Sequence, residues 1–103
     1  MAMSLISVVI ADDHRLFREG LRLILAQEES IKVVGEAANG LQAISVITDL
    51  KPDVVMLDIK MPEKNGIEIL PTIRKNSPMT KPLMLTGIVD EKTILMALKA
   101  GAK

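Results

Sequence analysis

Three aspartates have the spacing that brings carboxylates to one edge of a β-sheet. Asp12 and Asp13 directly follow a β-branched segment at residues 5–11, and Asp58 directly follows a largely apolar segment at residues 53–57. In open parallel α/β sheets, ligands bind at the carboxyl ends of the strands. A carboxylate at such a position is a candidate for chemistry, and we therefore predict that Asp58 is a nucleophile.

The same three side chains predict a metal site. If the strands before Asp12 and Asp58 are neighbours in a parallel sheet, the carboxylates share one pocket. Two ionised carboxylates about 5 Å apart repel by roughly 3 kcal/mol at an effective dielectric of about 20, so the cluster needs a proton or a cation. Magnesium prefers oxygen ligands, so we expect Mg²⁺ at Asp12, Asp13 and Asp58. The simpler alternative is that Asp12 and Asp13 only cap a helix and that Asp58 ends a strand in solvent.

Strands and helices are predicted to alternate along the whole chain. Short apolar or β-branched segments predict four strands, at residues 5–11, 31–37, 53–58 and 81–86. Apolar residues at three- and four-residue spacing predict four helices, around residues 16–25, 41–47, 67–73 and 90–98. Pro71 inside the third helix predicts a kink or a late helix start. The alternation predicts an α/β fold with a doubly wound parallel sheet and helices on both faces.

Composition excludes several classes of function. The 103 residues fit one domain, and 13 basic residues balance 13 acidic ones, so the sequence has no basic footprint for nucleic acid. Cysteine is absent, which excludes thiol catalysis and thiolate metal sites. The apolar segment at residues 5–11 is too short to span a bilayer. We expect a cytoplasmic protein that binds neither nucleic acid nor a membrane directly.

Several motifs together carry a resemblance to a known family. They follow one another in order at the ends of the predicted strands and in the loop after Asp58, as Asp12-Asp13, Asp58, Met61-Pro62, Gly66 and Thr86-Gly87. In this order and spacing, the chain resembles the receiver domain of bacterial two-component response regulators. The resemblance implies a flavodoxin-like three-layer sandwich.

The resemblance also implies a role for each site residue. Asp58 would be the phosphoacceptor, phosphorylated by a partner histidine kinase, and the chain would be a signalling domain rather than an enzyme. Asp12 and Asp13 would form the acidic magnesium pocket with Asp58, and the main-chain carbonyl of Lys60 would be a further metal ligand. The hydroxyl of Thr86 would contact the phosphoryl group.

Two further stretches indicate a subfamily. Residues 12–21, Asp-Asp-His-Arg-Leu-Phe-Arg-Glu-Gly-Leu, and residues 97–103, Ala-Leu-Lys-Ala-Gly-Ala-Lys, are similar to receivers that precede a LuxR/NarL-type helix-turn-helix domain. This implies transcriptional output through a DNA-binding domain outside this chain. His14, which follows the carboxylates, is expected to have a surface role rather than a catalytic one.

One departure from the family concerns the end of the chain. Receiver domains have a fifth strand, ending in a lysine that pairs with the phosphorylated aspartate, and a fifth helix. Lys103 comes too early to be that lysine, so residues 1–103 are expected to form an incomplete receiver domain. An incomplete sheet would leave an exposed edge and an uncovered apolar face, which predicts marginal stability or an assembly such as a homodimer.

Other functions compete with phosphoryl transfer. The main alternative is a phosphorylation-independent interaction module with a vestigial acidic pocket. A metal-dependent hydrolase is disfavoured, because such phosphatases usually carry a second acid two residues after the nucleophile, where this chain has Lys60. A flavin binder is disfavoured because the first loop lacks a Ser/Thr/Gly-rich phosphate cradle and Phe17 is the single aromatic residue.

Overall fold

The structure, a computed structural model, describes residues 5–59, 61 and 63–85. Its strands and helices alternate in the order β1 (Ile6–Ala11), α1 (Arg15–Ala26), β2 (Ile31–Ala37), α2 (Gly40–Leu50), β3 (Val54–Asp58), α3 (Gly66–Asn76) and β4 (Lys81–Leu85). The four predicted strands and the first three predicted helices are confirmed, with small shifts of their ends. The fourth predicted helix, around residues 90–98, lies outside the described residues.

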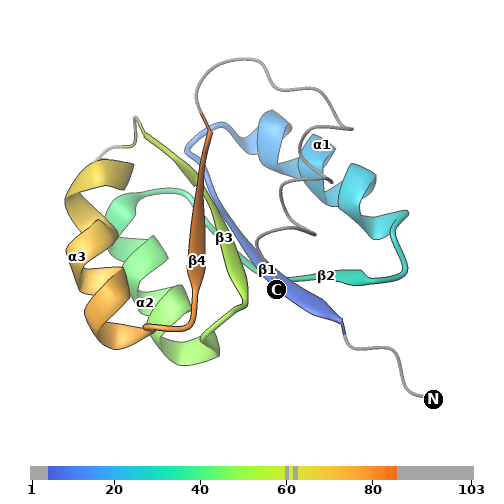
Figure 1. Cartoon of the computed structure of the whole chain (residues 1–103). Coiled ribbons are helices and arrows are strands. Elements are labelled where there is room, and N and C mark those ends of the chain that lie inside the picture. The colour runs from blue at the N-terminus through green and yellow to red at the C-terminus, as the bar shows by residue number, and fades with distance from the viewer. Residues whose placement is uncertain (1–4, 60, 62, 86–103) are drawn as a thin grey trace.

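The four strands form one parallel sheet in the order β2-β1-β3-β4. Helix α1 covers one face of this sheet, and α2 and α3 cover the other (Figure 1). The predicted doubly wound architecture with three layers is therefore confirmed. None of the helices in residues 5–85 is long and apolar enough to cross a membrane.

Among the described residues, the core consists of two hydrophobic clusters, one on each face of the sheet. Along β1, Val8 and Ile10 belong to the cluster under α1, whereas Val9 and Ala11 belong to the cluster under α2 and α3. All four side chains are fully buried, as expected from the period-2 alternation of a strand covered on both faces. This burial explains why β1 has an uninterrupted apolar sequence.

Side chains cap two of the three helices in the described residues. The Asn39 side chain accepts a hydrogen bond from the Gln42 amide at 2.8 Å and begins α2. Asn65 and Glu68 form a capping box at the start of α3, with hydrogen bonds of 2.9 and 3.1 Å. These bonds satisfy amides that the first helical turn leaves without an intrahelical partner.

Two local predictions about helix starts are wrong. The alternative in which Asp13 caps a helix does not hold for α1, because the residue that precedes this helix is His14, whose side chain makes no capping hydrogen bond. Helix α3 begins at Gly66 and continues through Pro71, so the predicted late start is also wrong. The capping box fixes the start of α3 five residues before the proline, while the predicted kink at Pro71 stays a prediction.

Candidate functional site

The site lies at the carboxyl edge of the two central strands. β1 and β3 pair in parallel with Ala11 opposite Leu57, so the residues that follow them, Asp12 and Asp58, emerge side by side. Single oxygens from Asp12, Asp13 and Asp58 and one ring nitrogen of His14 all lie within 4.8 Å of one another. The structure therefore brings together the three aspartates that the sequence singled out.

Asp12 is held in place by both its backbone and its side chain. It is only 3% exposed, and its amide donates a hydrogen bond to the Ala37 carbonyl of β2 at 3.0 Å. Its Oδ1 atom accepts the His14 amide at 2.8 Å, which closes the turn between β1 and α1. The backbone from Asp12 to His14 is thus hydrogen-bonded to β2 at one end and to the Asp12 side chain at the other.

His14 belongs to the cluster, which the sequence analysis did not predict. Its Nδ1 atom lies 2.9 Å from Asp12 Oδ1 and 3.0 Å from Asp13 Oδ1, although 73% of the side chain is exposed. The hydrogen bond with Asp12 and the negative charge of Asp13 raise the pKa of His14 above its ordinary value of 6.5. The expected position of His14 at the surface is confirmed. Its contact with the two aspartates was missed, although the place of His14 directly after them in the sequence could have indicated it.

The loop after Asp58 is packed closely against the end of β3. The Gly66 amide donates a hydrogen bond to the Ile59 carbonyl at 2.8 Å, and a Cβ atom at position 66 would overlap the Asp58 carbonyl oxygen. Glu63, inside this loop, has a left-handed φ of 65°. A Cβ atom on Gly40 would likewise overlap the backbone of Lys64. Two glycines without side chains therefore allow the loop to return beside the predicted nucleophile.

A pocket of about 420 Å³ opens beside the acidic cluster. It is lined by two aspartates, the histidine and three apolar side chains, namely Asp12, Asp58, His14, Leu16, Phe17 and Leu85. Leu16 begins the apolar spacing that predicted the helix around residues 16–25 and was expected to be buried with it, but the side chain is 83% exposed. This expectation was wrong because Leu16 lies in the first turn of α1, at the rim of the pocket, whereas Leu21 and Leu25 pack on the sheet.

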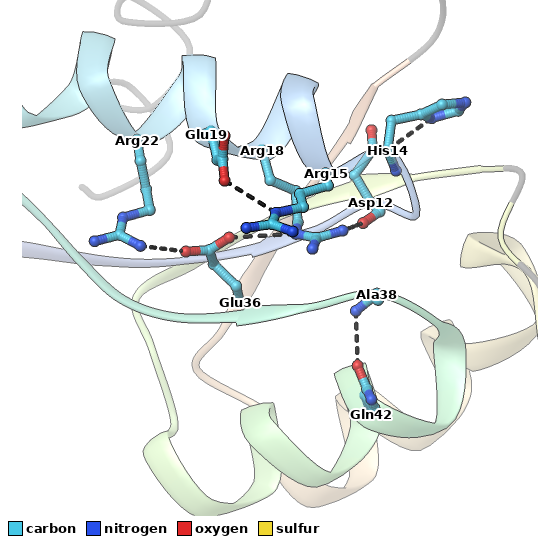
Figure 2. A network of polar contacts seen from close by, with 9 residues as sticks. All are labelled: Asp12, His14, Arg15, Arg18, Glu19, Arg22, Glu36, Ala38 and Gln42. Atoms are coloured by element: carbon cyan, nitrogen blue, oxygen red, sulfur yellow. Dashed lines mark hydrogen bonds and ion pairs between the residues drawn. The ribbon is translucent and has the colours of Figure 1, made fainter.

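A network of charged side chains connects the acidic loop to β2 (Figure 2). The Arg18 guanidinium donates to the Asp12 carbonyl oxygen at 2.6 Å and to Glu36 Oε1 at 3.2 Å. Arg22 donates to the other carboxylate oxygen of Glu36 at 2.9 Å. Sequence reasoning missed this network, because the two arginines had the helical spacing of an ordinary polar face.

The chemistry of the cluster fits a hard divalent cation. Three carboxylates supply oxygen ligands, which Mg²⁺ prefers, and they lie close enough together to bind one ion. The predicted contributions of the Lys60 carbonyl and the Thr86 hydroxyl lie outside the described residues. Within the described residues, the arrangement can hold a cation beside a carboxylate that faces an open pocket.

Comparisons with known proteins identify the family to which this chain belongs. Residues 8–103 match the response regulator receiver domain family. The chain is 46% identical over 96 residues to the transcriptional regulatory protein YhcZ of Bacillus subtilis and 40% identical over 96 residues to the response regulator protein VraR of Staphylococcus aureus. These alignments cover 93% of this chain but only 45% and 46% of the relatives, so the chain spans just under half of their length.

Among solved structures, the receiver domain of the response regulator NarL from Mycobacterium tuberculosis is 35% identical, with a TM-score of 0.77. The superposition covers 96% of this chain and 80% of that one. The family match spans nearly the whole sequence and includes all three clustered aspartates. The chain therefore belongs to the response regulator receiver domain family, among relatives of the LuxR/NarL type.

Proposed function

We propose that this chain is the phosphoacceptor domain of a two-component response regulator and that Asp58 receives a phosphoryl group from a histidine kinase. The observation that carries the proposal is the convergence of Asp12, Asp13 and Asp58 at one edge of the sheet in a member of this family. In this role the chain is a signalling domain that carries the group on its own side chain rather than an enzyme that acts on a separate substrate.

The transfer reaction uses the Asp58 carboxylate as the nucleophile. One carboxylate oxygen attacks phosphorus, the new O–P bond forms, and the P–N bond to the kinase histidine breaks. The imidazole leaves with the electron pair of that bond, and Asp58 becomes an acyl phosphate. The position of Asp58 at the end of β3, on the wall of the pocket, leaves room for the incoming group.

Asp12, Asp13 and Asp58 would hold Mg²⁺ for this reaction, together with the main-chain carbonyl of Lys60. When bound, the ion offsets the negative charge of the transferring phosphoryl group and of the crowded carboxylates. The contribution of the chain itself is to fix the carboxylates before the reaction, through the hydrogen bonds of Asp12 and the close packing at Gly66. The hydroxyl of Thr86 would donate a hydrogen bond to a phosphoryl oxygen of the product.

The proposed output of phosphorylation is transcriptional. The relatives are about twice as long as the aligned segment, and one of them is named a transcriptional regulatory protein. We infer that a helix-turn-helix domain outside this chain binds DNA in the full-length protein, which would work in the cytoplasm. Phosphorylation of Asp58 adds negative charge at the sheet edge, a local change of the kind that alters which surfaces a partner domain can bind.

The direct test is phosphorylation in solution. Incubation with Mg²⁺ and a small acyl-phosphate donor should add one phosphoryl group, measured by intact mass, and Asp58→Asn should abolish the addition. The matched control is Asp49→Asn, which removes an exposed aspartate of α2 and should leave the addition unchanged. Absence of the added group in the wild type, or its persistence in D58N, would contradict the proposal.

A further inference from the structure

Arg18 connects the acidic loop to strand β2. Its Nη1 atom donates to the main-chain carbonyl oxygen of Asp12 at 2.6 Å, and its Nε atom donates to Glu36 Oε1 at 3.2 Å (Figure 2). The Arg18 side chain is only 16% exposed, and that of Glu36 is 26% exposed. The guanidinium is therefore a largely buried group with a donor directed at each of two partners.

The carbonyl that Arg18 contacts belongs to the peptide between Asp12 and Asp13. On its other side, the Asp12 amide donates to the Ala37 carbonyl at 3.0 Å. Both hydrogen-bonding groups of the Asp12 backbone are thus engaged, one with the sheet and one with the guanidinium. This arrangement sets the plane of the peptide that follows Asp12, and with it the place of Asp13 relative to Asp12.

We propose that Arg18 is a positioning residue. Its hydrogen bond to the Asp12 carbonyl holds Asp12 and Asp13 in the arrangement that binds Mg²⁺. The proposal rests on the proposed function, because it assigns to Arg18 the metal affinity of the same acidic site. The Arg18 guanidinium contacts the main-chain carbonyl of Asp12 and the carboxylate of Glu36, so Arg18 acts on the site aspartates through the backbone.

An arginine suits this task better than a lysine does. The guanidinium presents donors in a rigid fork and can bind a carboxylate and a carbonyl at the same time, whereas an ammonium is a single point charge on a flexible stem. Glu36 offsets the charge of Arg18 and is itself held by Arg22 at 2.9 Å. Because Glu36 balances its charge, Arg18 can orient the acidic loop without leaving an unpaired positive charge beside the metal site.

Arg22 provides a matched comparison on the same helix. It binds the same carboxylate, Glu36, but its side chain is 60% exposed and makes no hydrogen bond to the acidic loop within the described residues. If the network only attached α1 to β2, loss of Arg18 and loss of Arg22 would both act on stability and leave the metal affinity unchanged. A purely electrostatic role for Arg18 predicts a change of the opposite sign, because removing a cation near a divalent ion strengthens its binding.

The test is a Mg²⁺ titration of the wild type, Arg18→Met, Arg18→Lys and Arg22→Met by calorimetry or by amide NMR. R18M should weaken Mg²⁺ binding about tenfold, at the low end of the roughly 10–100-fold typical for residues that orient metal ligands. R18K should also weaken it, since it keeps the charge but loses the fork. R22M should stay within about twofold of the wild type, as expected for an exposed ion pair.

Two further readouts separate positioning from folding. In the metal-free protein, the Asp13 amide resonance should shift in R18M and R18K but not in R22M, because that amide belongs to the peptide whose carbonyl Arg18 binds. With an acyl-phosphate donor, the Arg18 variants should need more Mg²⁺ for half-maximal phosphorylation and approach the wild-type rate at saturating Mg²⁺. R18K is the milder substitution and carries the test if R18M does not fold.

The outcomes distinguish this inference from the proposed function. If the wild type binds no Mg²⁺, the proposed function fails, and the role of Arg18 fails with it. If the wild type binds Mg²⁺ but both Arg18 variants bind it equally well or more tightly, positioning by Arg18 is overturned while the proposed function stands.

Discussion

His14 lies between the carboxylates of Asp12 and Asp13, with Nδ1 at 2.9 and 3.0 Å from one oxygen of each. A protonated imidazole offsets part of the negative charge that a metal ion would otherwise offset. The single histidine of the chain is therefore a reporter of the charge state of the site.

An NMR titration should place the pKa of His14 above 6.5 in the metal-free protein, because Asp12 and Asp13 both favour the imidazolium. A raised folded-state pKa means that this contact stabilises the fold fully below the unfolded-state pKa, and that the contribution is lost as the pH rises through the folded-state value. Asp13→Asn should lower the pKa, and so should Mg²⁺, since either change reduces the negative charge at the imidazole. A pKa at or below 6.5, or one insensitive to D13N, would contradict this account.

At the scale of the element, the turns at the ends of the strands decide the geometry of the site. The loop after β3 approaches the Asp58 carbonyl so closely that Gly66 has no room for a side chain. Helix α3 begins at that glycine, with its capping box formed by Asn65 and Glu68. The end of β3 and the start of α3 are thus one packed unit around the predicted phosphoacceptor.

Gly66→Ala should therefore destabilise the fold and slow phosphorylation together. Forcing a methyl group against the Asp58 backbone should cost about 1–3 kcal/mol of unfolding free energy, measured by urea denaturation. The matched control is Gly20→Ala in α1, where an added Cβ has open space and should instead stabilise the fold by about 0.5–1 kcal/mol. Equal effects of G66A and G20A on stability would rule out the close approach as the cause.

The positions of β1 and β3 were predictable because both strands are buried on both faces and therefore have nearly uninterrupted apolar sequences. Helix positions were predictable from the spacing of residues such as Leu21 and Leu25, which pack on the sheet. The same spacing failed for Leu16, because periodicity cannot tell a residue over the sheet from one at the rim of a pocket. The contact between Arg18 and the Asp12 carbonyl was not predictable, because it depends on how α1 lies against β2 in three dimensions.

The three aspartates were predictable as a group because parallel strands place their carboxyl ends at one edge. Their mutual distance and the participation of His14 depend on the turn after β1, where the sequence left open a helix cap by Asp12 or Asp13. The structure instead has Asp12 accepting the His14 amide, an interaction two residues along the chain. An aspartate side chain can accept a hydrogen bond from any of several nearby backbone amides, and the sequence alone does not show which of them it binds.

At the scale of the whole molecule, metal binding and folding are linked. An ion that binds the folded chain and not the unfolded one raises the unfolding free energy, by about 2.7 kcal/mol at a free concentration of 100 times Kd. The proposed site therefore makes the stability of the entire domain depend on Mg²⁺.

Thermal unfolding should move to higher temperature as Mg²⁺ is added to the wild type. Asp13→Asn should differ from the wild type both without Mg²⁺ and at high Mg²⁺. Without Mg²⁺ it should be more stable than the wild type by about 0.5–1 kcal/mol, because one of the crowded like charges is gone. With Mg²⁺ it should gain less than the wild type does. An identical Mg²⁺ response in the two proteins would count against the assignment of Asp13 as a ligand.

The pairing of β1 with β3 also limits how the site can be altered by substitutions far from it. Since alternate residues of β1 belong to opposite cores, sliding either strand by one residue would exchange the two cores as well as separate Asp12 from Asp58. Such a slip costs the burial of both layers at once, so intermediate spacings of the carboxylates are not accessible. Core substitutions should therefore lower the fraction of folded molecules while each folded molecule keeps an unchanged distance between its carboxylates.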